Sequence, residues 1–313
     1  MNHVSVFAPA SVANISCGFD VLGVCLDNIG DTLHIQETSK PGIAITEIIG
    51  QDLPLDPKKN VASVAGMALL ADHKSNRGFE IKIEKGIKAG SGIGSSSASA
   101  AGAVLGINHL LGNPYTRNEL ISFAMEGERV ACGTAHADNV SPVLLGGFTL
   151  VRSLNPLDVV TLNSPLELVV TIIHPEIEIK TADARAVLLD KLHLKQAVAQ
   201  TANLGALVTG LFKEDYELIR RSLVDHIVEP VRSMLIPGFG ELKKAANEAG
   251  APPLLFGSRT TRCTSDSAEG GRCCRRCSCG RCQGRSGGRC CGRRGDGAGA
   301  GSRGGGSEQG SHH

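Results

Sequence analysis

The first 256 residues show two hydrophobic periods, one typical of strands and one typical of helices. Apolar residues alternate with polar ones over residues 4–6, 33–35 and 79–83, and this period of two predicts three short, half-buried strands. Between Ala100 and Leu111 the apolar positions have helical spacing, which predicts a helix. The first part of the chain is therefore expected to combine a sheet with helices.

The alternation of strands and helices continues further along the chain. Thr116 and Glu119 have the spacing of a capping box, which predicts the start of another helix. Residues 147–151 and 168–173 predict two more strands, separated by a polar connection at 155–163. Helical patterns then occupy four stretches, residues 183–194, 196–212, 216–226 and 240–249. No strand is recognisable after the last of them.

This order of elements predicts an α+β fold in two domains. With 313 residues and a mass of 32.6 kDa, the chain is long enough for two ordinary hydrophobic cores. We expect an N-terminal domain over residues 1–156 and a second domain over 157–256 that lacks its final strand and helix. Residues 257–313 form a separate segment of low complexity.

The composition of the chain changes after Phe256. The remaining residues contain no Val, Ile, Leu, Met, Phe, Tyr or Trp, but they hold 16 of the 39 glycines, 8 of the 11 cysteines and 11 arginines. Such a segment cannot bury enough apolar surface to offset the entropy cost of ordering it. We therefore expect it to be disordered.

Three interpretations of this tail compete. Cys274 with Cys277, and Cys279 with Cys282, form two CxxC pairs, but the second pair begins too soon after the first for an ordinary four-cysteine zinc site. A disulfide framework would require an oxidising compartment. Cys, Arg, Ser and Gly codons can all end in GC, and a shift of one base turns these into alanine codons. We hypothesise that the tail is an alanine-rich segment translated out of frame, which sequencing the transcript across codons 245–260 would test.

The charge distribution limits the classes of partner. Of the 32 Lys and Arg residues, 11 lie after Phe256, so residues 1–256 carry 21 basic and 27 acidic groups, a net charge of −6. This balance argues against a body that binds nucleic acid. The apolar runs are far shorter than the roughly 20 residues that cross a membrane, and the N-terminus lacks the pattern of a signal peptide. A soluble, cytoplasmic protein is expected.

A glycine-rich loop carries the candidate chemistry. Residues 88–99 read KAGSGIGSSSAS and lie between a predicted strand and a predicted helix. Glycines at 90, 92 and 94 let backbone amides approach an anion, and the helix N-terminus adds partial positive charge, so the loop can cradle phosphate. It matches neither the Walker A loop nor the dinucleotide-binding fingerprint. An ordinary glycine-rich turn remains the alternative.

Three stretches together resemble a known family. The loop, with Ile87 and Lys88 before it, resembles the ATP-binding motif GLGSSA of the superfamily of galactokinase, homoserine kinase, mevalonate kinase and phosphomevalonate kinase, with Ile93 in place of Leu. Residues 7–23, FAPASVANISCGFDVLG, and residues 127–142, GERVACGTAHADNVSP, are similar to two motifs of the homoserine kinases. The resemblance extends over the first 251 residues and favours the homoserine kinase family.

The resemblance implies a fold and a reaction. The expected fold is an N-terminal domain like domain 2 of ribosomal protein S5, followed by a ferredoxin-like domain. The expected reaction transfers the γ-phosphoryl group of ATP to the side-chain hydroxyl of L-homoserine, in threonine biosynthesis, and the expected assembly is a homodimer. A kinase acting on another small alcohol such as mevalonate, or an inactive homologue that still binds nucleotide or homoserine, remains the alternative.

The resemblance also implies which residues bind ATP and its metal. Ser96 and Glu128 would hold Mg²⁺, because a hydroxyl and a carboxylate are the oxygen ligands that this ion prefers. Asn60 would contact the nucleotide, or would be an ordinary N-cap of the helix that follows it. The residues expected to bind the phosphates are Lys88, Ala89, Gly90, Ser91, Gly92, Ile93, Gly94, Ser95, Ser96, Ser97 and Ala98.

A second set would bind and orient the amino acid. By resemblance, Asp20 receives the substrate ammonium, Asn139 lies beside the reacting hydroxyl, and Arg185 and Arg232 bind the carboxylate, which suits planar guanidinium groups. Asp20 could instead be an ordinary turn residue. Because an amide such as that of Asn139 cannot accept a proton, the hydroxyl would be oriented rather than deprotonated by a side chain. The remaining members are Asn14, His136, which could also be structural, and Thr181 near the γ-phosphate.

The sequence departs from the family at one place. After the AGA at residues 249–251 the family has a third glycine-rich motif similar to GISGSGP, whereas this chain has PPLLFGSRTTRC. We expect this change to expose a strand edge and to remove part of the second core. The sequence therefore leaves two interpretations of this chain, an active kinase and an inactive homologue that still binds nucleotide or homoserine.

Overall fold

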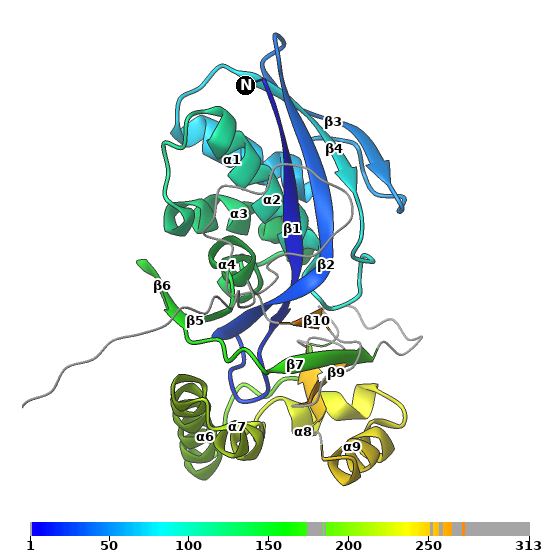
Figure 1. Cartoon of the computed structure of the whole chain (residues 1–313), viewed down its shortest axis with the longest axis vertical. Helices are drawn as coiled ribbons and strands as arrows, with labels where there is room; N and C mark the ends of the chain where they lie inside the picture. The colour runs from blue at the N-terminus through cyan, green and yellow to red at the C-terminus, as the bar shows by residue number, and fades with distance from the viewer. Residues whose placement is uncertain are drawn as a thin grey trace, which may run out of the picture. The chain divides into compact units, whose positions relative to one another are not determined.

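The computed structural model describes residues 2–173, 184, 186–250, 253–256, 259–264 and 271–272 (Figure 1). All of them belong to a compact unit, Met1–Cys277. Thr181, Arg185 and the cysteine pairs between 274 and 282 lie outside the described residues. The hypotheses about the tail therefore stay predictions. The domain boundary at residue 156 also stays a prediction.

The first sheet has six strands in the order β3-β4-β2-β5-β6, with β1 paired to β2. All of its pairs are antiparallel except β3 with β4. The strands are β1 (His3–Ala13), β2 (Leu22–Thr38), β3 (Gly42–Ile49), β4 (Gly78–Glu84), β5 (Phe148–Leu154) and β6 (Leu157–Leu162).

In this sheet the predicted strands are present, but the sequence analysis missed two others. It placed three strands before the glycine-rich loop, whereas the structure has four, and the additional one is β3. The expected connection at 155–163 is also wrong, because β6 lies within it. Most side chains of β6 are half-buried or exposed at the end of the sheet, so this strand lacks the alternation that identifies a strand with one buried face.

Four helices gather on one side of this sheet (Figure 1). The predicted helix after the glycine-rich loop is confirmed as α2, and the predicted capping box is confirmed at Thr116, which caps α3 together with Glu119. Phe79, Ile81 and Leu33 from the sheet pack with apolar side chains of the helices in a continuous core. The helices are α1 (Val61–Asp72), α2 (Ser95–Leu110), α3 (Arg117–Cys132) and α4 (Ala137–Leu145).

The second sheet has four strands in the order β10-β7-β9-β8, all antiparallel. Its strands are β7 (Val169–Ile173), β8 (Pro253–Phe256), β9 (Arg259–Thr264) and β10 (Gly271–Arg272). The helical segments of this part are α6 (Leu194–Lys213), α7 (Tyr216–Ser222), α8 (Glu229–Arg232), the 3-10 turn η1 (Ser233–Leu235) and α9 (Phe239–Glu248). None of the described helices is long and apolar enough to cross a membrane.

The expectation that no strand follows residue 250 is wrong. β8 and β9 form a hairpin, and β9 also pairs with β7 over Val169–Ile173. The sequence of β9, RTTRCT, has no hydrophobic alternation, so the periodicity could not identify it; Thr nevertheless suits an extended backbone. The predicted strand over 168–173 is confirmed by β7.

The helix predictions of this part are confirmed over 196–212 and 240–249, by α6 and α9. The prediction over 183–194 is wrong for residues 187–193, which are not helical, because α6 begins only after its N-cap at His193. The prediction over 216–226 is too long, since α7 ends at Ser222. Asp225, a few residues further on, accepts backbone hydrogen bonds from the turn before α8.

Candidate active site

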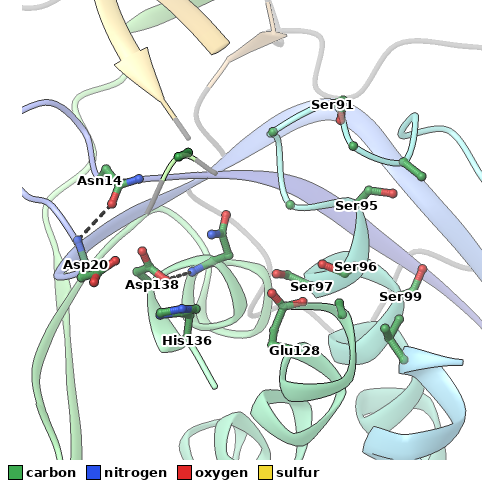
Figure 2. Close-up of a pocket in the computed structure, with 18 of the residues that line it drawn as sticks. Asn14, Asp20, Ser91, Ser95, Ser96, Ser97, Ser99, Glu128, His136 and Asp138 are labelled. Atoms are coloured by element: carbon green, nitrogen blue, oxygen red, sulfur yellow. Dashed lines mark hydrogen bonds between the residues drawn. The ribbon is translucent and has the colours of Figure 1, made fainter. Parts of the chain in front are cut away.

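A cavity of about 400 Å³ lies where the glycine-rich loop, the loop between β1 and β2, and the start of α4 meet. Figure 2 shows Asn14, Asp20, His136 and Asp138 on one side of this cavity. Ser91, the serines at the start of α2, and Glu128 lie on the other side. We call the side made by residues 89–99 and Glu128 the glycine-loop half. The opposite side, with Asn14, Asp20, His136 and Asp138 together with Arg232, is called the loop 14–20 half.

The glycine-rich loop adopts the backbone conformation that its glycines predict. Gly90, Gly92 and Gly94 have φ values of 68°, 75° and 70°, in the left-handed region that other residues avoid. A Cβ atom on Gly94 would come within 2.1 Å of the hydroxyl of Ser11, so a larger residue does not fit there. Gly94 is the N-cap of α2, and the free amide groups of the first turn are therefore available to an anion in the cavity.

Lys85, directly after β4, fixes the first turn of α2. Its side chain is 2% exposed, and Nζ donates hydrogen bonds to Asp31, to the carbonyl oxygen of Ser95 at 3.0 Å and to the hydroxyl of Ser99 at 3.0 Å. Because an ammonium group has three protons, these three acceptors use its full donor capacity. Lys85 lines the cavity, but its contacts are those of a support for the loop rather than of a free phosphate ligand.

Asp31, in the middle of β2, completes this support. Its side chain is fully buried, and Oδ1 accepts from the amide groups of Gly86 and Ile87, each at 3.1 Å. Oδ2 accepts from Lys85 and, at 3.1 Å, from the hydroxyl of Ser99. The pair therefore ties the sheet to both ends of the glycine-rich loop. The sequence analysis missed it, because Asp31 and Lys85 are far apart in the chain and belong to no local motif.

Glu128 is a buried carboxyl group with unused bonding capacity. It comes from α3, is 3% exposed, and its Oε1 atom has no hydrogen-bond partner among the residues that the structure describes. Burial raises the pKa of Glu128, and the hydroxyls of Ser96 and Ser97 partly oppose this rise. Figure 2 shows its carboxyl group directed toward these two serines. An unpaired carboxylate oxygen beside a hydroxyl fits a divalent cation, so the residues present suit Mg²⁺.

The loop between β1 and β2 forms much of the opposite wall. Asn14 and Asp20, both with left-handed backbone conformations, face the cavity, and the Asn14 Oδ1 atom accepts from the Asp20 amide at 3.0 Å. Next to them lies Asp138, which is 4% exposed. Burial, together with the charges of Asp20 and Glu128, raises the pKa of Asp138 to about 7. Three carboxyl groups around one cavity favour a cationic group on the ligand.

The start of α4 adds two polar side chains. His136 is the N-cap residue of α4, and its Nε2 atom lies 3.0 Å from the hydroxyl of Thr134. Asn139 is half-buried in the first turn, and its Oδ1 atom accepts from the hydroxyl of Ser11 at 3.2 Å. Since its oxygen is engaged in this way, the Asn139 Nδ2 group is the part left to donate to a ligand.

Arg232 brings a positive charge to the same cavity from the second part of the chain. It is 6% exposed, and its Nε atom donates to the carbonyl oxygen of Ala184 at 2.8 Å. The guanidinium carbon lies 5.2 Å from the centre of the Phe19 ring, within the range of a cation–π contact. Phe19, Ala184 and Arg232 all line the cavity.

The comparisons with known proteins agree on one family. Over residues 60–147 the chain matches the family described as "GHMP kinases N terminal domain". It is 45% identical over 287 residues to "Homoserine kinase" from Chlorobaculum tepidum, with 85% of this chain and 89% of that protein covered. The chain belongs to the homoserine kinase family.

Other members of the homoserine kinase family and the solved structures support this. Homoserine kinase from Chlorobium phaeobacteroides strain BS1 is 48% identical over 263 residues, which cover 80% of this chain and 82% of that protein. The crystal structure of homoserine kinase from Cytophaga hutchinsonii superposes with a TM-score of 0.81 at 50% identity, covering 85% of this chain and 86% of the other. A mevalonate kinase structure, at 14% identity and a TM-score of 0.60, shares the fold.

The family resemblance and the α+β kinase fold are thus confirmed. The structure brings together most of the residues that the homoserine kinase motifs imply. Those that line the cavity are Asn14, Asp20, Ala89, Gly90, Ser91, Gly92, Gly94, Ser95, Ser96, Ser97, Glu128, His136, Asn139 and Arg232. The predicted residues Lys88, Ile93, Ala98 and Asn60 do not line it. Asn60 is the N-cap of α1, its Oδ1 atom accepting from the amides of Ala62 and Ser63, so its contact with nucleotide stays a prediction.

Several cavity residues were not identified from the sequence. Asp138 lies within a motif of the homoserine kinases, directly before Asn139, so its position was visible but its burial was not. Phe19 likewise precedes Asp20 in the first motif, where it could have been noticed. Lys85 precedes the glycine-rich loop and Ser99 is its last residue, and only the fold shows that they share Asp31.

Proposed function

We propose that this chain transfers the γ-phosphoryl group of ATP to the side-chain hydroxyl of L-homoserine, giving O-phospho-L-homoserine. The observation that carries the proposal is one cavity with two chemically different halves. Glycine-loop amides at a helix N-terminus suit a polyphosphate. Carboxyl groups opposite a buried guanidinium suit an amino acid, whose ammonium and carboxylate carry opposite charges. Relatives that are 45% and 48% identical carry the name homoserine kinase, which agrees with this chemistry.

In the glycine-loop half, the amides of residues 90–97 hold the phosphates of ATP. Ser96 and Glu128 would hold Mg²⁺, which when bound neutralises phosphate charge during the transfer. The Asp31–Lys85 pair keeps the first turn of α2 in place, so that the loop is ordered before ATP arrives. This division of roles makes positioning and charge stabilisation the main contributions of the protein.

In the loop 14–20 half, Asp20 with Asn14 and Asp138 binds the ammonium group, and Arg232 binds the carboxylate. Asn139 donates to the hydroxyl through Nδ2 and so orients it toward the γ-phosphate, while His136 lines the pocket. An amide cannot accept the hydroxyl proton, which leaves late, to phosphate or water. Thr181 and Arg185, outside the described residues, are proposed to act near the γ-phosphate and the carboxylate. A homodimer and a cytoplasmic location stay predictions.

A coupled assay of ADP release tests this function. With Mg·ATP, we expect L-homoserine to accelerate ADP release far above the rate without acceptor, and mevalonate to give no such acceleration. Calorimetry with Mg·ATP measures nucleotide binding separately. A folded protein that released ADP no faster with homoserine than without it would contradict the proposed reaction.

A further inference from the structure

The loop between β1 and β2 contains an unusual amount of backbone strain. Asn14, Ile15, Ser16 and Asp20 have φ values of 73°, 36°, 57° and 58°, all in the left-handed region. For a β-branched residue such as Ile15 this conformation is a true outlier. A strained backbone persists only where surrounding contacts hold it, so the groups that hold this loop determine where Asn14 and Asp20 point.

One of these groups comes from the second part of the chain. The Nε2 atom of Gln200, in α6, donates to the carbonyl oxygen of Cys17 at 3.0 Å, across 183 positions of sequence. Gln200 is 7% exposed, and the peptide it contacts lies between the strained residues 14–16 and Asp20. A buried amide that donates to a loop carbonyl fixes the direction of that peptide, because breaking the bond would leave both groups unsatisfied.

Gln200 is itself fixed by the segment that leads to Arg232. Its Nε2 group also donates to Asp225 at 3.1 Å, and its Oε1 atom accepts from the amide of His226 at 2.8 Å. Asp225 accepts in turn from three amides at 2.9 to 3.0 Å, which organises the turn before α8. Both side-chain protons and the oxygen of Gln200 are therefore in use, and its side chain joins two separate segments of the chain.

The same two segments meet a second time inside the cavity. Arg232, at the end of α8, lies within cation–π distance of the ring of Phe19, which is located between Cys17 and Asp20 in the strained loop. The loop proposed to bind the ammonium group and the arginine proposed to bind the carboxylate are thus joined at two points. The contact between Phe19 and Arg232 lies inside the cavity. The contact made by Gln200 lies outside it, because Gln200 does not line the cavity.

We propose that Gln200 is a positioning residue for the amino-acid subsite: it sets the distance between the ammonium-binding loop and Arg232 without contacting the substrate. The proposal rests on the proposed function and deepens it, since it explains how the site selects a compound with both an ammonium and a carboxylate group. Asp225 supports Gln200 in this role.

The test compares Gln200→Met with a control on the same helix. Methionine keeps the length of the side chain and removes its hydrogen bonds. Asn203→Leu is the control, because Asn203 donates to the carbonyl oxygen of Val224, in the same segment, and among the described residues it forms no hydrogen bond with the loop. We expect Gln200→Met to raise the KM for L-homoserine at least tenfold and to leave the KM for ATP within twofold. Asn203→Leu should leave both within twofold.

A second readout separates positioning from general loss of structure. 4-Hydroxybutanoate keeps the carboxylate and the hydroxyl of homoserine but lacks the ammonium group. We expect Gln200→Met to reduce the preference in kcat/KM for homoserine over 4-hydroxybutanoate by about tenfold. Partial unfolding lowers both values equally and leaves the ratio unchanged. An unchanged ratio would overturn the proposal. If Gln200→Met does not fold, Asp225→Asn, which weakens the support of Gln200, is expected to change the ratio in the same direction.

Binding measurements distinguish failure of this inference from failure of the proposed function. Calorimetry gives the affinity of the wild-type chain and of Gln200→Met for homoserine without any turnover. A wild-type chain that binds homoserine but does not phosphorylate it would contradict the proposed reaction, while a tenfold loss of affinity in Gln200→Met would still support the positioning role. Equal affinities would contradict the role alone, and no binding by the wild-type chain would contradict both.

Discussion

The two halves of the cavity are built in different ways. The glycine-loop half consists of one short stretch, residues 89–99, with Glu128 facing it from α3. The loop 14–20 half is assembled from residues 14–20, the start of α4, Ala184 and Arg232. The first half is supported by a buried ion pair within the first sheet, and the second by contacts between distant parts of the chain.

This difference bears on how each half performs its task. ATP presents the same phosphates to many kinases, and a contiguous loop whose conformation is set by its own glycines suffices to bind them. An amino acid must be recognised at both ends at once, which requires groups at a fixed separation. In this fold the separation depends on side chains such as Gln200 and Phe19, which hold the binding groups rather than provide them. Changes in each half should therefore affect different measurements.

The largest effect is expected from the support of the glycine-loop half. Lys85→Met leaves the buried carboxylate of Asp31 without its counter-charge, which typically costs about 3–5 kcal/mol of the free energy of unfolding. Lys82→Met, in the strand β4 that directly precedes Lys85, is the control, because Lys82 forms an exposed pair with Glu47 at 2.9 Å, a kind of pair that contributes about 1 kcal/mol or less. Urea unfolding measures both.

The double variant Asp31→Asn with Lys85→Met sharpens this comparison. It removes both charges, so we expect it to recover part of the stability that Lys85→Met alone loses. The affinity for Mg·ATP should be lower than that of the wild type in both the single and the double variant, because in each the carbonyl oxygen of Ser95 lacks the hydrogen bond from Lys85. A Lys85→Met variant no less stable than Lys82→Met would contradict the view that this pair supports the loop.

The next largest effect is expected at Glu128. Glu128→Gln removes the negative charge proposed to hold Mg²⁺, and we expect kcat to fall about a hundredfold, the scale observed when one charge-stabilising group is lost. The folded state should be as stable as before or more so, because a neutral amide is buried in place of a carboxyl group. Glu126→Gln, on the exposed face of the same helix, is the control. Equal activity of the two variants would exclude a metal-binding role for Glu128.

Arg232→Lys probes the loop 14–20 half. Lysine keeps the charge but loses the planar group that can bind a carboxylate through two hydrogen bonds and that forms the cation–π contact with Phe19. A hydrogen bond to a charged group contributes about 1.5–3 kcal/mol, so we expect the KM for homoserine to rise about 10- to 100-fold. The KM for ATP should be unchanged, as should both values in the exposed control Arg221→Lys. A rise in the KM for ATP alone would reverse the assignment of the two halves.

The same contrast explains what could be predicted from the sequence. The glycine-rich loop, Ser96 and Glu128 were found because they lie in short motifs, and α2 and the Thr116 cap follow from local patterns. Asp31, Gln200 and the strand β9 could not be found. A buried Asp or Gln looks like any surface residue until the chain folds around it, and β9 is defined by pairing with β7 rather than by its own hydrophobic pattern.

The smallest expected effect is a pH dependence at Asp138. Its pKa lies at about 7, above the ordinary value of 3.8, mainly because of burial. The group therefore stays protonated up to about pH 7 and is ionised above it, when it attracts an ammonium group. We expect the KM for homoserine to fall a few-fold, on the order of 1 kcal/mol, between pH 6 and pH 8. 4-Hydroxybutanoate, which has no ammonium group, should not show this fall.

Asp138→Asn separates this carboxyl group from others that titrate in the same range. The variant should bind homoserine more weakly at pH 8 and show little change with pH. The stability of the protein without substrate should change with pH in the opposite sense to homoserine binding. Between pH 3.8 and about 7 the Asp138 carboxyl group is ionised in the unfolded chain but still protonated in the folded one. The free energy of unfolding of the wild-type protein therefore falls as the pH rises through this range. Asp138→Asn lacks this contribution. A variant that kept the pH dependence of the KM for homoserine would contradict the assignment of this pH dependence to Asp138.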